Sequence, residues 1–521
     1  MTGWAAILRA ARAERDTFRR AGAQPRATQL VLLKHILERG RSSAFGRAHG
    51  FEDIGSVEAF RRQVPVRGYD GFKPWIDRVV AGEGAVLTAE PVIAFEETGG
   101  SRSGRKLVPY TQASLQAFRT AVLPWLGDLA DTQPATFAGR AYVAISPAAR
   151  APQVTAGGIP IGLPSEGAYL GEDLMAAFAS VLAVAPEVAG ILDIDRWRFA
   201  TLRSLLAAAD LSFVSVWSPT FLLSLVQALP ALLEPLVRSV HDGAIEGDPI
   251  PSPALAPDPE RARLITAAAA RDPIDTPRLW PQLRTVSAWA DGASRPYAQR
   301  LREAFPHAQL QPKGLLATEG AVTIPWSGPS GAVPALTSTF LEFIGDDGRA
   351  LLCDELRAGE GYRVVMTTPG GFYRYDLGDR LRCREFDHGL PRLEFIGRSG
   401  VATDIVGEKL TEGFVADALD RVDAQACLAP RATATPFYEL LVEAPRENLR
   451  LLAASVEQSL RDNPQYAYAR AIGQLGPVAP RAVERLLDRY MHFEAGRGRR
   501  LADIKPPLLI DDSATYSALI K

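Results

Sequence analysis

The chain has few cysteines and few histidines for its 521 residues. Cys353, Cys383 and Cys427 are far apart, odd in number and without CxxC spacing, which argues against a disulfide scaffold and against a zinc site. The six histidines show no metal-binding spacing such as HxxxH, so we expect most of them at surface or packing positions.

An excess of charge of either sign is also missing. The chain carries 58 basic and 60 acidic residues, for a net charge of -2. Nothing in this balance calls for a nucleic acid or an anionic membrane as partner. With 47% apolar and 23% charged residues, the chain is typical of a soluble globular protein and long enough for two or three domains.

No apolar run suggests a membrane span. The run "LMAAFASVLAVA" from Leu174 stops at Pro186 and is expected to form a buried helix. The N-terminal "MTGWAAILRAARAERDTFRRAG" lacks the apolar core of a signal peptide and carries Glu14 and Asp16, so we expect an amphipathic helix of the folded protein. These patterns favour a cytoplasmic protein.

Lysine is scarce, since arginine supplies almost all of the positive charge. The lysines are Lys34, Lys73, Lys106, Lys313, Lys409, Lys505 and Lys521. A lysine ammonium is a compact point charge, unlike the planar fork of arginine. The bias therefore marks Lys106, Lys409 and Lys505 as candidates for a role that needs such a charge.

The apolar pattern predicts an order of elements. We expect helices over the first 90 residues, strands at "PVIAFEET" and "KLVPY", a helix after an N-cap at Thr111, and a long helical region from 174 to 240. The proline-rich stretch 246–260 is expected to be an irregular loop, and strand-like runs follow up to residue 397. Short helices and strands then alternate, which indicates a boundary between domains 1–397 and 398–521.

The segment "FEETGGSRSGRKLVPYT", from Phe95 to Thr111, is rich in glycine and hydroxyl groups. It does not match a Walker loop, because Lys106 comes one residue late and a strand follows in place of a helix. It is also a poor match to the GxSxG turn of serine hydrolases. Glycines would let backbone amides approach an anion, to which Ser101 and Ser103 would donate hydrogen bonds. A glycine-rich hairpin turn explains the segment equally well.

Two later motifs carry single carboxylates. "GLLATEGAVTIP" has Glu319 after an apolar strand, where it suits a magnesium ion held with nucleotide phosphates, although a turn glutamate is the simpler interpretation. "GGFYRYDLGDRLRC" ends near Asp379, which is placed to accept the hydroxyls of a ribose or to form an Asx turn between two strands.

Taken together, "TGGSRSGRKLVPYT", "LLATEG", "GFYRYDLGD" and "FIGRSGVATDIVGEKLTE" resemble, in order and rough spacing, the acyl-acid amido synthetases of the auxin-responsive Gretchen Hagen type. Those enzymes belong to the adenylate-forming superfamily of acyl-CoA synthetases, peptide-synthetase adenylation domains and luciferases. The resemblance covers nearly the whole chain. It implies an α/β fold, with a large N-terminal adenylate-forming domain of β-sheets flanked by helices and a small mobile α+β C-terminal domain.

The resemblance implies a set of nucleotide-binding residues. In chain order they are Thr98, Gly99, Gly100, Ser101, Ser103, Gly104, Lys106, Thr318, Glu319, Tyr373, Asp379 and Arg398. The first seven would form the phosphate-binding loop, Glu319 would contact magnesium, and Asp379 would hold the ribose with Tyr373 and Arg374 beside it. Arg398 would be the hinge of the small domain.

Lys409 and Lys505 resemble lysines that the small domain brings to the phosphates or to the acyl carboxylate, so with Glu319 they are the catalytic candidates. The loop departs from the family at Gly99, where relatives commonly carry Ser, and at Ser101 and Arg102, where Thr and a hydroxyl residue are usual. The run "GLLATEG" also lacks the tyrosine that many plant members have before the acidic residue.

The function implied is ATP- and Mg²⁺-dependent adenylation of a small-molecule carboxylic acid, followed by transfer of the acyl group to an amine, expected to be an amino acid. The acid would be aromatic or aliphatic and would bind among residues 110–320 of a monomeric protein. Three alternatives stay open: a ligase that forms a thioester with coenzyme A or a carrier protein, a catalytically impaired nucleotide-binding homologue, and a nucleotide-dependent enzyme without acyl chemistry.

Overall fold

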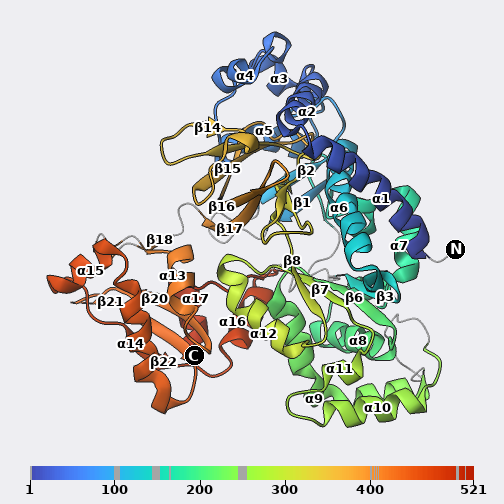
Figure 1. The fold of residues 1–521 in the computed structure, drawn as a ribbon, viewed down its shortest axis with the longest axis vertical. Helices are drawn as coiled ribbons and strands as arrows, with labels where there is room; N and C mark the ends of the chain where they lie inside the picture. The colour runs from blue at the N-terminus through green and yellow to red at the C-terminus, as the bar shows by residue number, and fades with distance from the viewer. Residues whose placement is uncertain are drawn as a thin grey trace.

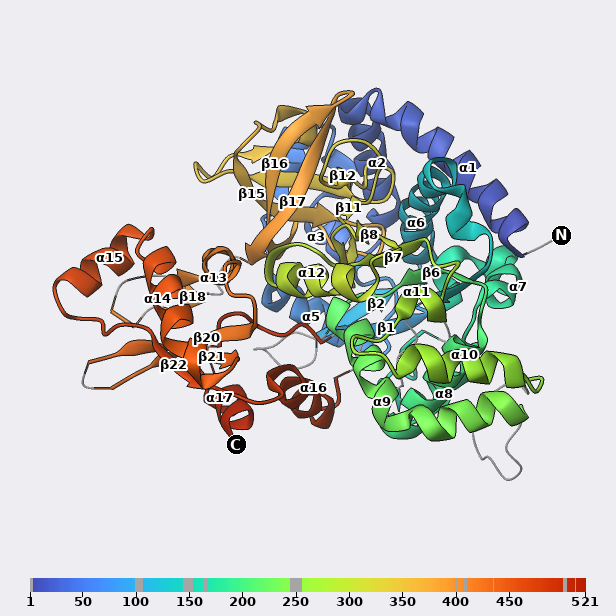
Figure 2. The ribbon, with the colours of Figure 1, turned by 60° about the horizontal axis from the view of Figure 1, so that its bottom comes forward.

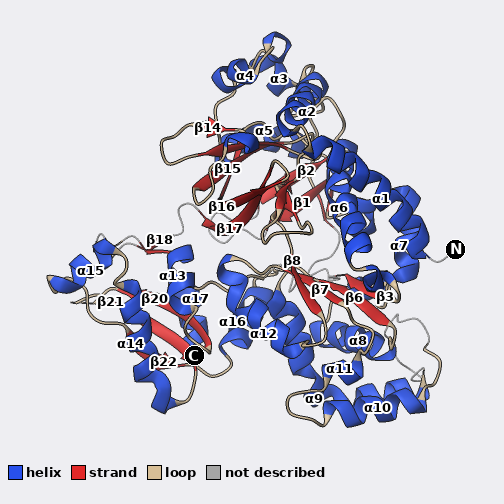
Figure 3. Cartoon of the chain, in the orientation of Figure 1, coloured by secondary structure: helices blue, strands red, loops and turns tan. Residues whose placement is uncertain are grey.

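The computed structural model describes most of the chain and shows a large N-terminal part and a smaller C-terminal domain (Figure 1). The described residues are 3–98, 106–143, 153–163, 166–243, 255–398, 402–403, 405–406, 408, 410–433, 435–499, 504–510 and 512–521. Both parts contain helices and strands (Figure 3). The mixed α/β class predicted from the sequence is confirmed.

Five helices form the N-terminal segment, as predicted. They are α1 (Gly3–Gly22), α2 (Pro25–Gly40), α3 (Ala44–Ala48), α4 (Val57–Gln63) and α5 (Tyr69–Val80). Helix α1 is amphipathic, and Ile7, Ala11 and Phe18 are buried at helical spacing on one face. That face packs on α6 (Gln112–Thr132), where a Cβ at Gly127 would lie 2.4 Å from the carbonyl oxygen of Ala11. The close approach of the two helices therefore requires glycine.

The glycine-rich segment leaves one strand and returns along the next. Strands β1 (Ala94–Thr98) and β2 (Lys106–Tyr110) are antiparallel, and Thr98 pairs with Lys106. The short strands β4 (Gln153–Val154) and β5 (Pro160–Ile161) complete this sheet. Helix α6 begins after the predicted cap, because the Thr111 hydroxyl accepts a hydrogen bond from the Ser114 amide at 3.2 Å.

A five-stranded antiparallel sheet carries Asp379 and Arg398. Its order is β14 (Ala350–Leu351), β13 (Phe340–Ile344), β15 (Gly361–Thr367), β16 (Tyr375–Asp387) and β17 (Leu390–Arg398). The predicted strand-like runs after residue 336 fall on β13, β15, β16 and β17, the two earlier runs fall on β7 and on β8 and β9, and β14 was not predicted. The short strands before it are β9 (Leu316–Ala317), β10 (Gly320–Ala321), β11 (Thr323–Ile324) and β12 (Val333–Pro334).

A parallel sheet forms the second layered unit of the large domain (Figure 2). Its order is β3 (Arg140–Val143), β6 (Leu211–Ser215), β7 (Thr285–Ala288) and β8 (Gln309–Pro312). The helices of this unit are α8 (Ile194–Ala207), α9 (Pro219–Asp242), α10 (Pro259–Ala269), α11 (Thr276–Leu279) and α12 (Arg295–Ala304). Ligands of such sheets bind at the carboxyl ends of the strands.

The predicted continuous helical region from 174 to 240 is wrong, because β6 interrupts it. All five residues of β6 are buried, and periodicity alone does not separate such a short buried strand from a buried helix. The run from Leu174 was also misjudged: α7 (Glu172–Val181) buries only Leu174 and Val181. Most of the predicted loop at 246–260 lies outside the described residues, and α10 begins at Pro259.

Among the described helices, α9 is long and apolar enough to cross a membrane by length and composition alone. Its buried residues include Phe221, Leu225, Leu229 and Leu236, and they belong to the core of the parallel-sheet unit. A core helix of a globular protein can have the same length and apolar composition as a membrane-spanning helix, so α9 does not by itself indicate a membrane partner.

The C-terminal domain is a small α+β unit. Its elements are β18 (Ala402–Thr403), β19 (Leu410–Thr411), α13 (Glu412–Leu419), β20 (Gln425–Arg431), β21 (Phe437–Glu443), α14 (Leu449–Leu460), α15 (Pro464–Ala471), β22 (Ala479–Ala482), α16 (Leu486–Gly496) and α17 (Ser513–Ile520). It has its own core around Leu440, Val456 and Tyr466. The boundary at Gly397-Arg398 stays a prediction, although β17 ends at Arg398.

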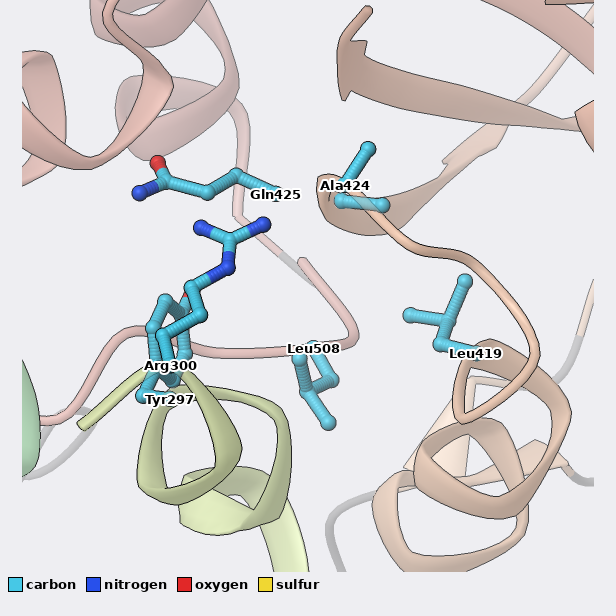
Figure 4. Close-up of a pocket in the computed structure, with 7 residues that line it drawn as sticks. Tyr297, Arg300, Leu419, Ala424, Gln425 and Leu508 are labelled. Atoms are coloured by element: carbon cyan, nitrogen blue, oxygen red, sulfur yellow. The ribbon is translucent and has the colours of Figure 1, made fainter. Parts of the chain in front are cut away.

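The two domains share apolar contacts. Leu487 and Ile504 of the C-terminal domain belong to the same buried cluster as Tyr297 and Leu301 of α12. A small pocket lies at this contact (Figure 4). The residues that line it from α12 and from the C-terminal domain are Tyr297, Arg300, Leu419, Ala424, Gln425, Ala426 and Leu508.

Candidate functional site

Glu319 sits in a tight turn that three neighbouring elements hold in place. Strands β9 and β10 pair Ala317 with Gly320, so Thr318 and Glu319 form the two-residue turn between them. The hydroxyl of Tyr110 donates a hydrogen bond to the carbonyl oxygen of Thr318 at 2.6 Å. The hydroxyl of Tyr375, at the start of β16, donates to Oε1 of Glu319 at 2.9 Å.

The surroundings of Glu319 disfavour its negative charge. Burial raises the pKa of this carboxyl above its ordinary value, and nearby Asp379 acts in the same direction. The hydrogen bond from Tyr375 and the positive charge of Arg398 oppose that rise. Burial and the neighbouring Glu319 carboxyl in turn raise the pKa of the Tyr375 hydroxyl, which therefore remains a hydrogen-bond donor.

Asp379 and Arg398 form an ion pair across adjacent strands. They stand opposite each other in the register of β16 and β17, and Arg398 Nε donates to Oδ1 of Asp379 at 2.7 Å. Asp379 is buried, and its charge raises the pKa of the Arg398 guanidinium. Asp379 lies within a strand, so the Asx-turn alternative is wrong; Asp376 instead makes such a contact, to the Gly378 amide at 3.0 Å.

The structure therefore brings together four residues that the sequence separates. The charge of Asp379 raises the pKa of Glu319 and the charge of Arg398 lowers it, and the Tyr375 hydroxyl donates a hydrogen bond to Glu319. Three of these residues were predicted from the motifs. Tyr375 was not singled out, although it stands inside the quoted "YRYDLGD" motif and a buried tyrosine near a carboxylate usually finds it as a partner.

Tyr373 and Arg374 do not join this group. Tyr373 is buried, its hydroxyl donates to the carbonyl oxygen of Leu87 at 2.9 Å, and its ring stacks on Phe45 at a centroid distance of 5.0 Å. Arg374 is buried against Glu342, with Nε 2.8 Å from Oε2. Both side chains are part of the core, and a role of either beside the nucleotide stays a prediction.

Two of the candidate lysines are described. The ammonium of Lys106, on β2, lies 5.3 Å from the ring centroid of Tyr69. The ammonium of Lys505 lies 3.5 Å from the ring centroid of Trp289, which follows β7 at the carboxyl edge of the parallel sheet. Lys409 and the loop residues Gly99, Gly100, Ser101, Ser103 and Gly104 lie outside the described residues, as does the side chain of Thr98.

Sequence reasoning missed the cluster around Trp289. Lys313 is buried between the rings of Trp125 and Trp217, at 5.6 and 4.5 Å from their centroids, and donates to the Ser215 hydroxyl at 2.7 Å. The scarcity of lysine, which marked Lys106, Lys409 and Lys505 as candidates, applies to Lys313 as well. No pattern in the sequence shows that the tryptophans meet, because Trp125 lies on α6 and Trp217 and Trp289 follow two different strands.

The fold is similar to those of two solved structures. It matches that of a crystallised 2-hydroxyisobutyryl-CoA ligase in a post-adenylation state with a TM-score of 0.57, at 12% identity over 94% of this chain and 89% of that one. It matches the AtGH3.15 acyl acid amido synthetase in complex with 2,4-DB with a TM-score of 0.87, at 20% identity over 98% of this chain and 95% of that one. The chain therefore shares its fold with both of these solved structures.

Sequence comparison then gives the family. Residues 14–310 match the GH3 family N-terminal domain and residues 332–398 match the GH3 family central domain. The chain belongs to the GH3 family, which confirms the resemblance drawn from the motifs.

Two relatives extend this picture. The jasmonoyl–L-amino acid synthetase JAR6 of Nicotiana attenuata is 25% identical over 91% of this chain and 89% of its own length. The probable indole-3-acetic acid-amido synthetase GH3.12 of Oryza sativa subsp. japonica is 26% identical over 75% and 72%. Both names describe amido synthetases, which are ligases.

Proposed function

We propose that this protein is an AMP-forming acyl-acid amido synthetase that joins a small-molecule carboxylic acid to an amino acid. Membership of the GH3 family over most of the large domain carries the proposal. The group of Glu319, Tyr375, Asp379 and Arg398 supports it, because it places two carboxylates and a guanidinium together in the domain that the family shares.

The residues present fit ATP with a magnesium ion. The Glu319 carboxylate is a hard oxygen ligand, and its raised pKa marks a place where a cation would stabilise the ionised form. Among the described residues no group of three or more His, Cys, Asp or Glu side chains is placed to hold a metal. A magnesium ion at Glu319 would therefore take most of its ligands from phosphates and water, and it would neutralise phosphate charge there.

Asp379 fits the ribose. Its Oδ1 accepts from Arg398, but a carboxylate has about four lone-pair positions, so it can also accept from ribose hydroxyls. The ion pair with Arg398 fixes the orientation of the carboxylate before any ligand arrives. Lys106 and the backbone amides of the glycine-rich loop are the proposed phosphate contacts.

Two half-reactions follow from this arrangement. In the first, a carboxylate oxygen of the acid attacks the α-phosphorus of ATP, the bond to the β-phosphate oxygen breaks, and acyl-adenylate and pyrophosphate form. Both reactants are anions, so fixed positive charges from Lys106 and Lys505 lower the barrier by offsetting their repulsion. In the second, the amine nitrogen attacks the acyl carbonyl, AMP leaves with the bonding electrons, and the amine releases a proton.

The test uses purified protein, Mg·ATP and a panel of acids, with and without pooled amino acids. The panel includes jasmonate, indole-3-acetate and 2,4-DB, because relatives and a matched structure carry those acids in their descriptions. Acid-dependent pyrophosphate, more AMP when an amino acid is added, and a product of amide mass are expected. A thioester formed only when coenzyme A is supplied would favour the alternative ligase.

ATP binding without turnover of any acid would instead favour the catalytically impaired homologue. Light scattering during the same purification tests the monomer that we also propose. The cytoplasmic location is a proposal as well, and a fluorescent fusion checks it.

A further inference from the structure

Tyr69 starts helix α5 close to a backbone position that a strand of the candidate site holds. The Arg67 amide donates to the Arg374 carbonyl oxygen at 3.2 Å, and the Asp376 amide donates to the Arg67 carbonyl oxygen at 2.8 Å. These bonds pair Arg67 in a parallel bridge with Tyr375, whose hydroxyl belongs to the candidate site. Tyr69 follows Arg67 by two residues, so backbone contacts fix its place relative to that site.

The hydroxyl of Tyr69 is bound to the backbone of β2. In the described part of the chain, β2 is the edge strand of the sheet β2-β1-β5-β4. The Leu107 amide donates to the Tyr69 hydroxyl at 2.8 Å, and the hydroxyl donates to the Leu107 carbonyl oxygen at 3.2 Å. One hydroxyl thus serves as acceptor and donor where a further strand would otherwise pair. The ring is thereby tied to the residue that follows Lys106.

The ring held in this way lies beside the side chain of Lys106. The ammonium is 5.3 Å from the ring centroid, which is within the range of a cation–π contact. Lys106 pairs with Thr98 across the β1–β2 hairpin, so β1 holds its backbone from the other side. Both Tyr69 and Lys106 are half-buried. The aromatic face therefore meets the lysine at the point where the glycine-rich segment ends.

Tyr69 also lies near the carboxylate of the candidate site. Burial raises the pKa of its hydroxyl above the ordinary value, and the charge of Glu319 acts in the same direction. The hydroxyl therefore stays protonated near neutral pH and keeps its hydrogen bond to the Leu107 carbonyl oxygen. Lys106 and Glu319, which come from two separate motifs, are thus both close to the same tyrosine.

We propose that Tyr69 is a positioning residue that holds the ammonium of Lys106 in place for contact with the phosphates of the nucleotide. An aromatic face attracts a cation without accepting its protons as a carboxylate does. The contact also restricts the rotamers of a long side chain before the nucleotide binds, so less conformational entropy is lost on binding. This inference rests on the proposed function, in which Lys106 is a phosphate contact.

Calorimetric titration with Mg·ATP, in the absence of any acid, tests the inference by equilibrium binding. Tyr69→Leu removes the aromatic face and should raise the Kd roughly 3- to 30-fold. Tyr69→Phe keeps the face and should retain most of the affinity. In a Lys106→Ala background, Tyr69→Leu should change the Kd less than about two-fold, because Tyr69 acts through that lysine.

Trp75→Leu is the matched control. Trp75 lies on the same helix, is also half-buried and carries the guanidinium of Arg78 at 5.2 Å from its ring centroid. Its substitution should leave the Kd unchanged. An equal loss from Tyr69→Leu in the Lys106→Ala background overturns the inference, as does a Tyr69→Phe variant no better than Tyr69→Leu. An unchanged Kd in Lys106→Ala overturns it too, because Lys106 would then not contact the phosphates.

A second readout needs neither the nucleotide nor a substitution at Tyr69. Reductive methylation with ¹³C-formaldehyde labels the lysine amines, and Lys106→Arg identifies the Lys106 signal. The ring current of Tyr69 should shift its methyl resonance upfield, and Tyr69→Leu should remove that shift. No upfield shift in the unsubstituted protein overturns the inference. The expected shift and the expected Kd changes, without pyrophosphate release for any acid, would support the inference and count against the proposed function alone.

Discussion

The hydroxyl of Tyr375 donates a hydrogen bond to Oε1 of Glu319 across 2.9 Å and joins two motifs that lie 56 residues apart in the chain. Tyr375 begins β16, and Glu319 occupies the turn between β9 and β10. Because burial raises the pKa of Glu319 while this bond opposes the rise, the pair decides at which pH the carboxyl is ionised. Substitution of Glu319 or Tyr375 should therefore change the stability or the pH dependence of activity in a measurable way.

Glu319→Gln should lower acid-dependent pyrophosphate release by about 100-fold or more, because it removes the proposed anionic contact to the magnesium ion. The same change should raise Tm near neutral pH. The folded-state pKa of Glu319 is raised, so ionisation costs more in the folded than in the unfolded protein, and stability falls as pH rises through that pKa. Calorimetry and the pyrophosphate assay check both results; unchanged activity would remove Glu319 from the site.

The pH dependence of kcat/KM for ATP should also reflect the raised pKa of Glu319. The acid limb of kcat/KM for ATP should lie above the ordinary range of a glutamate, since binding needs the ionised carboxylate and its pKa is raised. Tyr375→Phe removes a bond that stabilises the charged form and should move the limb to still higher pH. Steady-state rates measured across pH for the unsubstituted protein and for Tyr375→Phe test this prediction. An acid limb that stays in place or moves to lower pH in the variant contradicts the role given to the Tyr375–Glu319 pair.

Asp379→Asn should raise KM for ATP by roughly 10- to 100-fold, as expected when a charged hydrogen-bond partner is lost. The variant weakens both the ion pair with Arg398 and the proposed ribose contact. Asp346→Asn is the control, because Asp346 pairs with Arg380 in the same region but its side chain is 82% exposed, and such pairs contribute little. Equal effects of the two substitutions would mean that Asp379 has no special role.

Tyr373 and Arg374 should behave as core residues. Arg374→Met should destabilise the fold by about 3 kcal/mol or more, because it leaves the buried Glu342 with a weaker set of partners. Tyr373→Phe should cost about 1 kcal/mol for its lost hydrogen bond and leave KM for ATP unchanged. Urea denaturation and ATP titration measure these effects. A higher KM for ATP in Tyr373→Phe would show that Tyr373 contributes to nucleotide binding.

Local patterns were enough to predict much of the fold. The Thr111 cap, strands β1 and β2, and strands β13, β15, β16 and β17 were predicted, because capping residues and apolar patterns mark them in the sequence. Strand β6 was missed because every residue in "LSFVS" is buried, so the segment shows no alternation that would separate it from the flanking helices.

The candidate site was predictable only where a motif names its residues. Glu319, Asp379 and Arg398 were proposed as site residues because short segments of the sequence resemble a family. A motif does not show where a side chain packs, and Tyr373, which precedes β16, packs on Phe45 of the N-terminal helices. The contact between Lys505 and Trp289 depends on how two domains pack, which no local pattern contains.

The most direct test of the account follows the oxygen atoms of the acid. The protein is incubated with ATP, an amino acid and an accepted acid whose carboxylate carries ¹⁸O, and the nucleotide product is analysed by mass spectrometry. The account predicts AMP with one ¹⁸O atom in its phosphate, because the acid oxygen that attacked the α-phosphorus leaves with AMP when the amide forms. ADP together with ¹⁸O in inorganic phosphate would contradict adenylation and show that the acid attacks the γ-phosphorus instead.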